Sequence, residues 1–314
     1  GRFGQLRQHI QYSAYVRALR DLVGQLLLED EAQRDFWKTR MLEALGDNAQ
    51  VLIDAIPELE SILGPQSPVP ELSGIAAQNR FNLLFRKWIG VLASALHPLV
   101  IFLDDLQWAD PLSLELTQQL VSRGQKGSLL LLGAYRDNEV SPLHPLNRML
   151  TESESIGGPP ICIHLDPLTL SDINRLVADA LGCSPQMSMP LADLLYRIAQ
   201  GNPFFNNQLL KSLHDEGLIF FDPKARHWQC DITQIASLSL TDDVVEFLAS
   251  QLQKLPEGTR EVLKLAACFG DSFNLSSLSA VSQMSRIETT ARLWPALQAG
   301  AVLPLSEEAK LTSG

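Results

Sequence analysis

Two consecutive carboxylates directly follow an unbroken apolar run near the middle of the chain. The segment LVIFLDDLQWAD covers residues 99–110, and its first five residues are typical of a parallel strand covered by helices on both faces. Open sheets of this kind bind ligands beyond the carboxyl ends of their strands. Asp104 could bind Mg²⁺ there, directly or through water, while Asp105, facing the other way by the period-two geometry of a strand, could orient a nucleophilic water.

A second strand places an arginine at the same edge. The apolar segment SLLLLGAY, 128–135, ends at Arg136, and a helix predicted over about 111–123, with Asp110 suited to its N-cap, joins it to the first strand. Both strands of such a βαβ unit lie in one parallel sheet. Arg136 could therefore contact a γ-phosphate or the two aspartates, although an exposed ion pair is the ordinary role of an arginine at a strand end. The aspartates, likewise, could be ordinary polar residues facing a helix N-terminus.

A third stretch, QGNPFF at 200–205, places Asn202 at the N-cap of a helix and Pro203 at its first position. Helix capping alone would explain both residues.

The hydrophobic pattern predicts an α/β core followed by helical domains. Helical segments are expected over 12–45 and 51–63, then a long helix over 75–96, with a third strand at 161–165. Short helices follow over 171–181, 191–200 and 203–216, with a hairpin near 218–232 and further helices over 241–254, 256–268, 275–283 and 286–299. Three of these C-terminal helices and a terminal strand, AVLPL, suggest a winged helix.

Composition excludes several classes of protein. The 314 residues are 46% hydrophobic and 19% charged, so the chain as a whole is not disordered, and a net charge of -11 gives no overall attraction to nucleic acid or anionic lipid. No apolar run approaches the roughly 20 residues that a membrane span needs. The four cysteines show no metal-ligand spacing, so we interpret them as buried thiols of a cytoplasmic protein. The opening GRFGQL, without Met, indicates an internal piece of a longer polypeptide.

These segments together resemble a known family. LDDLQWAD, LLLLGAYRDNEV and then GNPFF are similar to the signal-transduction ATPases with numerous domains (STAND), a branch of the AAA+ P-loop NTPases with an Orc1-like ATPase domain. The resemblance is closest to the ATPase segment of bacterial, notably cyanobacterial, multi-sensor serine/threonine and histidine kinases. It implies a P-loop NTPase core over 1–166, a helical lid with a β-hairpin over 167–235 and a winged-helix-like domain over 236–314.

The resemblance also assigns roles to individual residues. It makes Asp104 the Walker B acid that serves Mg²⁺, Asp105 the acid that polarises water, and Arg136 the sensor of the γ-phosphate. Asn202 and Pro203 correspond to the lid motif that lies near the adenine of ATP. Trp108 corresponds to a characteristic aromatic residue, for which packing under the following helix is the simpler explanation.

One motif of the family is missing. The phosphate-binding pattern G-x-x-x-x-G-K-[ST] does not occur in these 314 residues, and GQKGS at 124–128 lacks its spacing. In the family that loop precedes the segment resembling GRFGQL, so we expect the first strand and the P-loop to lie upstream of Gly1. We accordingly expect these residues alone to be inactive as an ATPase.

The leading hypothesis is an ATP-binding and hydrolysing switch module of a multidomain kinase. ATP, ADP and Mg²⁺ are the expected ligands, the attached kinase and sensor domains the expected partners, and a nucleotide-dependent oligomer is conceivable. Two alternatives stay open: the ATPase module of a DNA-binding transcription regulator, and a degenerate scaffold that does not hydrolyse ATP.

We predict that the C-terminal segment 236–314 does not bind DNA. It contains six Lys and Arg residues against nine Asp and Glu residues, and its candidate recognition helix, 286–299, has only Arg286 and Arg292. Specific DNA binding usually requires several phosphate contacts from Lys and Arg. Titration of the isolated segment with mixed duplex DNA at physiological salt checks this. Submicromolar, salt-sensitive binding would instead favour the transcription regulator.

Overall fold

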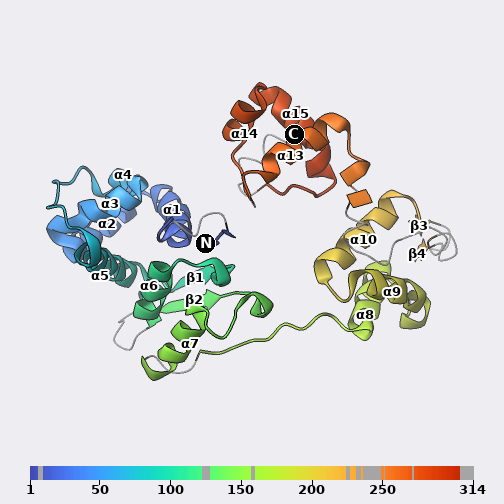
Figure 1. Cartoon of the computed structure of the whole chain (residues 1–314), viewed down its shortest axis with the longest axis horizontal. Coiled ribbons are helices and arrows are strands. Elements are labelled where there is room, and N and C mark those ends of the chain that lie inside the picture. Colours follow the sequence, from blue (N-terminus) through green and yellow to red (C-terminus); the bar gives the residue numbers. More distant parts are fainter. Residues whose placement is uncertain are drawn as a thin grey trace. The chain divides into compact units, whose positions relative to one another are not determined.

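The chain forms two compact units, Gly1–Cys162 and Ile163–Gly314. A computed structural model describes residues 1–5, 10–121, 128–156, 160–223, 227–230, 235, 249–250, 252–270 and 272–304 (Figure 1). The predicted division at residues 166 and 235 stays a prediction.

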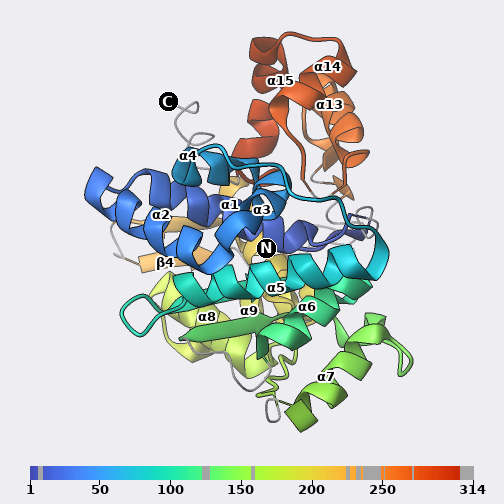
Figure 2. The same cartoon turned by 90° about the vertical axis from the view of Figure 1, so that its left-hand side faces the viewer.

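The first unit contains a small parallel sheet with helices before, between and after its strands. Its helices are α1 (Ser13–Leu27), α2 (Glu31–Leu45), α3 (Ala49–Ala55), α4 (Glu60–Leu63), α5 (Gly74–Leu92), α6 (Pro111–Val121) and α7 (Pro145–Ile156). Its strands are β1 (Leu99–Leu103) and β2 (Leu129–Gly133), and short 3₁₀ turns lie at Gly46–Asn48 (η2), Pro57–Leu59 (η3), Leu106–Trp108 (η4) and Asp137–Glu139 (η5). In Figure 2, α5 runs beside α3 and α6, which it contacts.

The two strands confirm the predicted βαβ unit. They pair in parallel from Leu99 opposite Leu129 to Leu103 opposite Gly133, with α6 between them in the sequence. The first residues of the chain extend this pairing beyond β1, because Asp104 N donates to Gly1 O over 2.9 Å and Phe3 N to Asp104 O over 3.0 Å. Three stretches of chain therefore run side by side where β1 ends.

The two faces of the sheet differ. Ile101 and Leu103 of β1 are buried in the main core, whereas four apolar side chains on the opposite face remain 44–56% exposed: Val100, Phe102, Leu130 and Leu132. The prediction that helices cover both faces is therefore wrong for the described residues. The unbroken apolar run predicts a face suited to burial, but only tertiary packing decides whether that face is covered.

Buried aromatic rings join α1 to α5 and α6. Tyr15 meets Phe85 edge-on, with ring centroids 5.5 Å apart, and Phe85 meets Trp88 in the same way. The Tyr15 hydroxyl lies 2.6 Å from Thr117 Oγ1 of α6, and the Tyr12 hydroxyl donates to Asn82 Oδ1 of α5 over 3.0 Å. Burial raises the pKa of Tyr12 to about 12. Both phenols are thus neutral hydrogen-bonding groups inside the core.

Helix α5 ends before the predicted boundary at residue 96. Its last residue is Leu92, and Ser94 and His97 then exchange backbone hydrogen bonds of 3.0 and 3.1 Å in a tight turn ahead of Pro98. The helix ends early because these residues form the turn that leads into β1.

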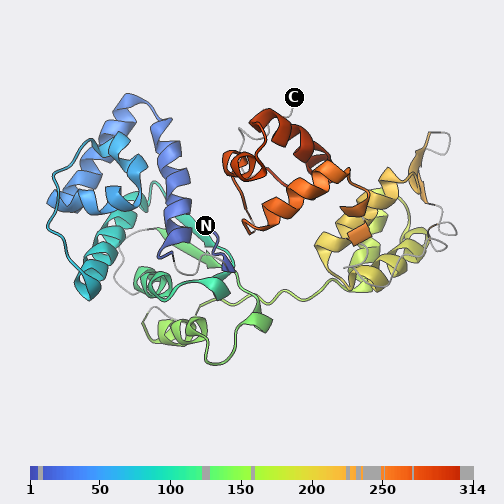
Figure 3. The same ribbon diagram turned by 45° about the horizontal axis from the view of Figure 1, so that its top comes forward.

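The second unit is mainly helical. Its elements are α8 (Leu170–Leu181), α9 (Pro185–Ala199), α10 (Pro203–Asp215), the antiparallel hairpin β3 (Ile219–Asp222) and β4 (His227–Cys230), α13 (Glu257–Ala267), α14 (Leu275–Ser282) and α15 (Arg286–Gln298). Figure 3 shows the hairpin beside α8, α9 and α10. The hairpin and the later helices agree with the sequence prediction, but α9 begins at Pro185 instead of 191, since Pro at the first helical position favours a start there.

The third predicted strand, 161–165, is wrong. Residues 160–169 have no regular structure, and Ile161, Ile163 and Leu165 are almost fully exposed. Alternating apolar residues form a strand only when a neighbouring strand accepts and donates their backbone hydrogen bonds, and the described chain offers this segment none.

The predicted terminal strand of a winged helix is also not formed over 301–304. The backbone N–H groups of Ala301 and Val302 both donate to Ala296 O, so these residues close the end of α15 instead of pairing with a strand. Leu305 and most of the predicted helix over 241–254 lie outside the described residues.

Two further observations concern the exposed surface. Cys162 and Cys268 are exposed and Cys183 and Cys230 are partly buried, so the prediction of buried thiols is wrong. Within the described ranges, no helix is long and apolar enough to cross a membrane.

We predict that two leucines of the same sheet differ sharply in their contribution to stability. Leu103→Ala removes a fully buried side chain and should lower the free energy of unfolding by about 2–5 kcal/mol. Leu130→Ala, on the half-exposed face, should cost less than about 1 kcal/mol. Urea denaturation of the whole chain measures both, and equal losses would show that the second face is covered.

Candidate functional site

The candidate site lies where β1 ends. Leu103 is the last residue of β1, and the backbone of Asp104 forms a parallel β-bridge with that of Arg2. Asp105 then adopts a left-handed backbone with φ of 55° before the η4 turn. The sequence predicted that strand alternation turns the two carboxylates in opposite directions. That prediction is wrong, because β1 ends at Leu103 and Asp105 has a left-handed backbone. The left-handed turn at Asp105 sets their orientation, and Asp105 N donates to Asp104 Oδ1 over 3.0 Å.

The two carboxylates differ in exposure. The Asp104 side chain is 40% exposed and that of Asp105 only 7%. Arg2 contacts both: its Nε donates to Asp105 Oδ2 over 2.6 Å and lies 3.8 Å from Asp104 Oδ2. Asp104 is thus open to a ligand, whereas Asp105 is fixed by a charge-assisted hydrogen bond.

Gln107 is the second partner of Asp105. Its Nε2 donates to Asp105 Oδ1 over 3.2 Å and to Glu139 Oε2 over 3.3 Å, while its Oε1 accepts from Arg136 N over 3.3 Å. Gln107 is almost completely buried. Sequence reasoning missed both Arg2 and Gln107. Only the fold brings Arg2 to the aspartates, whereas Gln107 is a neighbour in the sequence whose side chain meets Asp105 through the η4 turn.

Arg136 lies at the predicted edge but does not contact the aspartates. Its Nη1 donates to Glu139 Oε1 over 3.2 Å, and its side chain is 59% exposed. Only its backbone N–H joins the hydrogen-bonded group, through Gln107. Its guanidinium is therefore accessible to an anion from solvent.

Asn202 and Pro203 belong to the second unit, where the predicted capping is confirmed. Asn202 Oδ1 accepts from Phe204 N over 3.0 Å, and Pro203 is the first residue of α10. Gly201, with φ of 81°, approaches Leu168 closely enough that a side chain there would collide with its carbonyl oxygen. Trp108, partly buried, packs against the main core of the first unit, which is the simpler role expected for it.

The chemistry of Asp104 fits a hard divalent cation. Mg²⁺ prefers carboxylate oxygens and keeps several waters, and one half-exposed carboxylate at a strand end suits that mode of binding. No group of three or more His, Cys, Asp or Glu residues that could hold a metal occurs in the described part of the chain. The remaining ligands would then be waters and phosphate oxygens.

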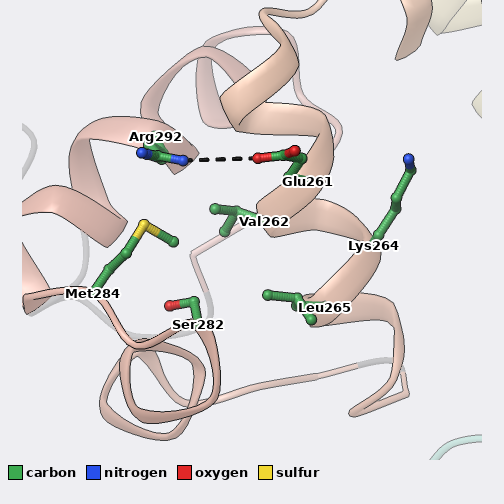
Figure 4. A pocket seen from close by; sticks show the side chains of 7 residues that line it. All are labelled: Glu261, Val262, Lys264, Leu265, Ser282, Met284 and Arg292. Carbon is green, nitrogen blue, oxygen red and sulfur yellow. Dashed lines mark ion pairs between the residues drawn. The ribbon is translucent and has the colours of Figure 1, made fainter.

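A separate pocket of about 580 Å³ lies among α13, α14 and α15 (Figure 4). Seven residues line it: Glu261, Val262, Lys264, Leu265, Ser282, Met284 and Arg292. Arg292 Nη1 lies 3.9 Å from Glu261 Oε2 across it, as Figure 4 shows. Arg292 of the candidate recognition helix lines it, but none of the candidate catalytic, metal-binding or nucleotide-binding residues does.

The first part of the chain is similar to a known family. Residues 1–132 match the AAA ATPase domain family. This AAA ATPase segment contains β1, both aspartates, Gln107, α6 and most of β2, but ends before Arg136.

Two curated relatives align with most of the chain. The hybrid signal transduction histidine kinase G of Dictyostelium discoideum is 29% identical over 91% of the chain, and the peroxide stress-activated histidine kinase mak3 of Schizosaccharomyces pombe is 20% identical over 87%. The alignments cover only 10% and 13% of those proteins. The chain thus has homology to a limited part of much longer histidine kinases.

Solved structures of Thermotoga maritima RuvB are distantly similar. One point mutant of RuvB matches 85% of this chain and 82% of its own at 17% identity with a TM-score of 0.30. Another point mutant matches 67% of each chain at 18% identity with a TM-score of 0.29.

We predict that Arg2 stabilises the fold through Asp105. Arg2→Met leaves a buried carboxylate with Gln107 as its remaining side-chain partner and should lower the free energy of unfolding by about 1–2 kcal/mol. Arg20→Met, which breaks the 3.1 Å pair of two half-exposed side chains with Glu58, is the matched control and should have almost no effect. Chemical denaturation compares the two, and equal effects would contradict this role of Arg2.

Proposed function

We propose that this chain is an ATP-binding and hydrolysing switch module of a signal-transduction kinase. One observation carries the proposal: two consecutive aspartates, one accessible and one buried, lie at the carboxyl end of a parallel strand within a segment that matches the AAA ATPase domain. Ligands of open α/β sheets bind at that edge.

The two aspartates have different proposed roles because their surroundings differ. Asp104, the exposed one, would hold Mg²⁺, which when bound neutralises charge on the phosphates of ATP. Asp105, with one oxygen bonded to Arg2 and the other to Gln107, is the acid that we assign to orienting the attacking water. Its hydrogen bonds keep the carboxylate in one orientation, as positioning catalysis requires.

Arg136 and the lid residues complete the proposed site. The exposed guanidinium of Arg136 would contact the γ-phosphate. Among the described side chains Glu139 is its one ion-pair partner, and that pair leaves other N–H groups accessible. Asn202 and Pro203 would contribute to nucleotide binding from the segment 167–235, which we propose as the lid.

The homology to histidine kinases supports the regulatory part of the proposal. We infer that nucleotide state changes how the lid and the C-terminal helical segment pack, and that this change reaches kinase and sensor domains of the same polypeptide. A two-state element biased by a γ-phosphate and Mg²⁺ is the physical basis of such switches. A nucleotide-dependent oligomer and cytoplasmic location belong to the same proposal.

We predict that substitution of the two aspartates separates binding from hydrolysis. In the natural polypeptide, Asp105→Asn should lower ATP turnover by about 100-fold or more while ATP remains bound. Asp104→Asn should instead weaken Mg²⁺-dependent ATP binding. Phosphate release and calorimetry measure the two effects.

Asp54→Asn on α3 is the matched control, since Asp54 is exposed and, among the described side chains, hydrogen-bonds only to Gln50. Unchanged turnover in both site variants would reject the assignment. If the wild-type protein binds MgATP without turnover, the non-hydrolysing scaffold takes its place.

A further inference from the structure

Gln107 joins several groups of the candidate site, although the sequence analysis did not single it out. It lies in η4, two residues after Asp105, with 4% of its surface exposed. Its side chain reaches three groups: the Asp105 carboxylate, the Glu139 carboxylate and the backbone N–H of Arg136. We propose that Gln107 is a positioning residue for ATP hydrolysis, an inference that rests on the function proposed above.

The first step of the argument is the chemistry of the amide. A primary amide carries two N–H donors and one carbonyl acceptor, and here both kinds of group are used. The Nε2 group lies 3.2 Å from Asp105 Oδ1 and 3.3 Å from Glu139 Oε2, so the two N–H groups can serve two carboxylates at once. A carboxylate at position 107 would offer neither donor and would add a third negative charge.

The second step concerns the acceptor. Gln107 Oε1 receives the N–H of Arg136 over 3.3 Å, which connects the turn after β1 to the loop after β2. Main-chain bonds reinforce the connection, since Leu106 N donates to Ala134 O over 2.9 Å. Gln107 therefore fixes the carboxylate of Asp105, which is proposed to orient water. It also fixes the backbone N–H of Arg136, whose side chain is proposed to contact the γ-phosphate.

The third step is that Gln107 itself is fixed. His144 Nε2 donates to the main-chain carbonyl oxygen of Gln107 over 3.0 Å, and His144 Nδ1 accepts from Leu146 N over 3.1 Å. These two bonds set one tautomer for the ring. A buried amide whose own backbone is anchored loses little entropy when it orients a neighbour. Gln107 does not contact the reacting atoms in this scheme, and acts through Asp105 and Arg136.

The test uses two variants of Gln107 in the natural polypeptide. Gln107→Leu removes all three hydrogen bonds, and Gln107→Glu has nearly the same shape but replaces the donor with a carboxylate oxygen. Each should lower kcat for ATP about ten- to a hundredfold, because misplaced groups lose rate steeply, while KM for ATP changes less than about twofold. Gln119→Leu and Gln119→Glu on α6 are matched controls, since among the described residues the Gln119 amide hydrogen-bonds only to Glu115 of the same helix.

A second readout does not depend on catalysis. Amide hydrogen exchange at Arg136 should be faster by about tenfold or more in Gln107→Leu, because its N–H loses its acceptor. Wild-type kcat in either Gln107 variant, or unchanged Arg136 exchange in Gln107→Leu, would overturn the inference. Absence of MgATP turnover in the wild type would instead contradict the proposed function, while the exchange measurement would still test the connection.

A double variant distinguishes the contact of Gln107 with Asp105 from its contact with Glu139. Gln107→Glu combined with Glu139→Gln restores a donor–acceptor pair between positions 107 and 139, but leaves Asp105 with Arg2 as a donor and none at position 107. Turnover should therefore stay as low as in Gln107→Glu alone. Recovery to the wild-type value would show that only the contact with Glu139 matters and would reject positioning of Asp105.

Discussion

Asp105 is an ionisable group with almost no access to water, and burial of such a group is tolerable only where hydrogen bonds replace its hydration. Two donors meet that requirement, Arg2 at one oxygen and Gln107 at the other. Gln107 is close to Asp105 in the sequence, whereas Arg2 comes from the distant N-terminal segment. The need to satisfy one carboxylate therefore joins the first residues of the chain, the turn after β1 and, through Gln107, the loop after β2.

The arrangement gives the aspartates unequal properties. Asp104 remains half exposed and suited to a cation, while Asp105 is held in one orientation by its partners. The left-handed backbone at Asp105 produces this difference, because it turns the chain away from the sheet immediately after Asp104. Strained backbone of this kind persists where surrounding contacts determine it, and it occurs frequently at functional sites.

The sheet that carries the site has one face packed and one face half exposed. Val100, Phe102, Leu130 and Leu132 lie on the second face, on strands whose parallel pairing is typical of sheets covered on both sides. A surface of this composition favours association with further protein.

Local signals in the sequence determined much of this protein. The apolar runs at 99–103 and 128–133, the cap at Asp110 and the GNP motif at 201–203 predicted β1, β2 and the starts of α6 and α10, because strand periodicity and capping depend on near neighbours. The consecutive aspartates and the position of Arg136 at the same edge followed from the same pattern. Only tertiary structure decided which groups meet them.

Arg2 lies about a hundred residues from Asp105 in the sequence, and no periodicity or motif could have paired them. Tertiary structure likewise decided that 161–165 is not a strand and that 301–304 closes a helix, because pairing depends on a partner whose position local sequence does not specify. The sequence by itself determined the chemical groups and the elements that carry them. Their hydrogen bonds, and hence the different surroundings of Asp104 and Asp105, depended on contacts between distant segments that only the folded chain brings together.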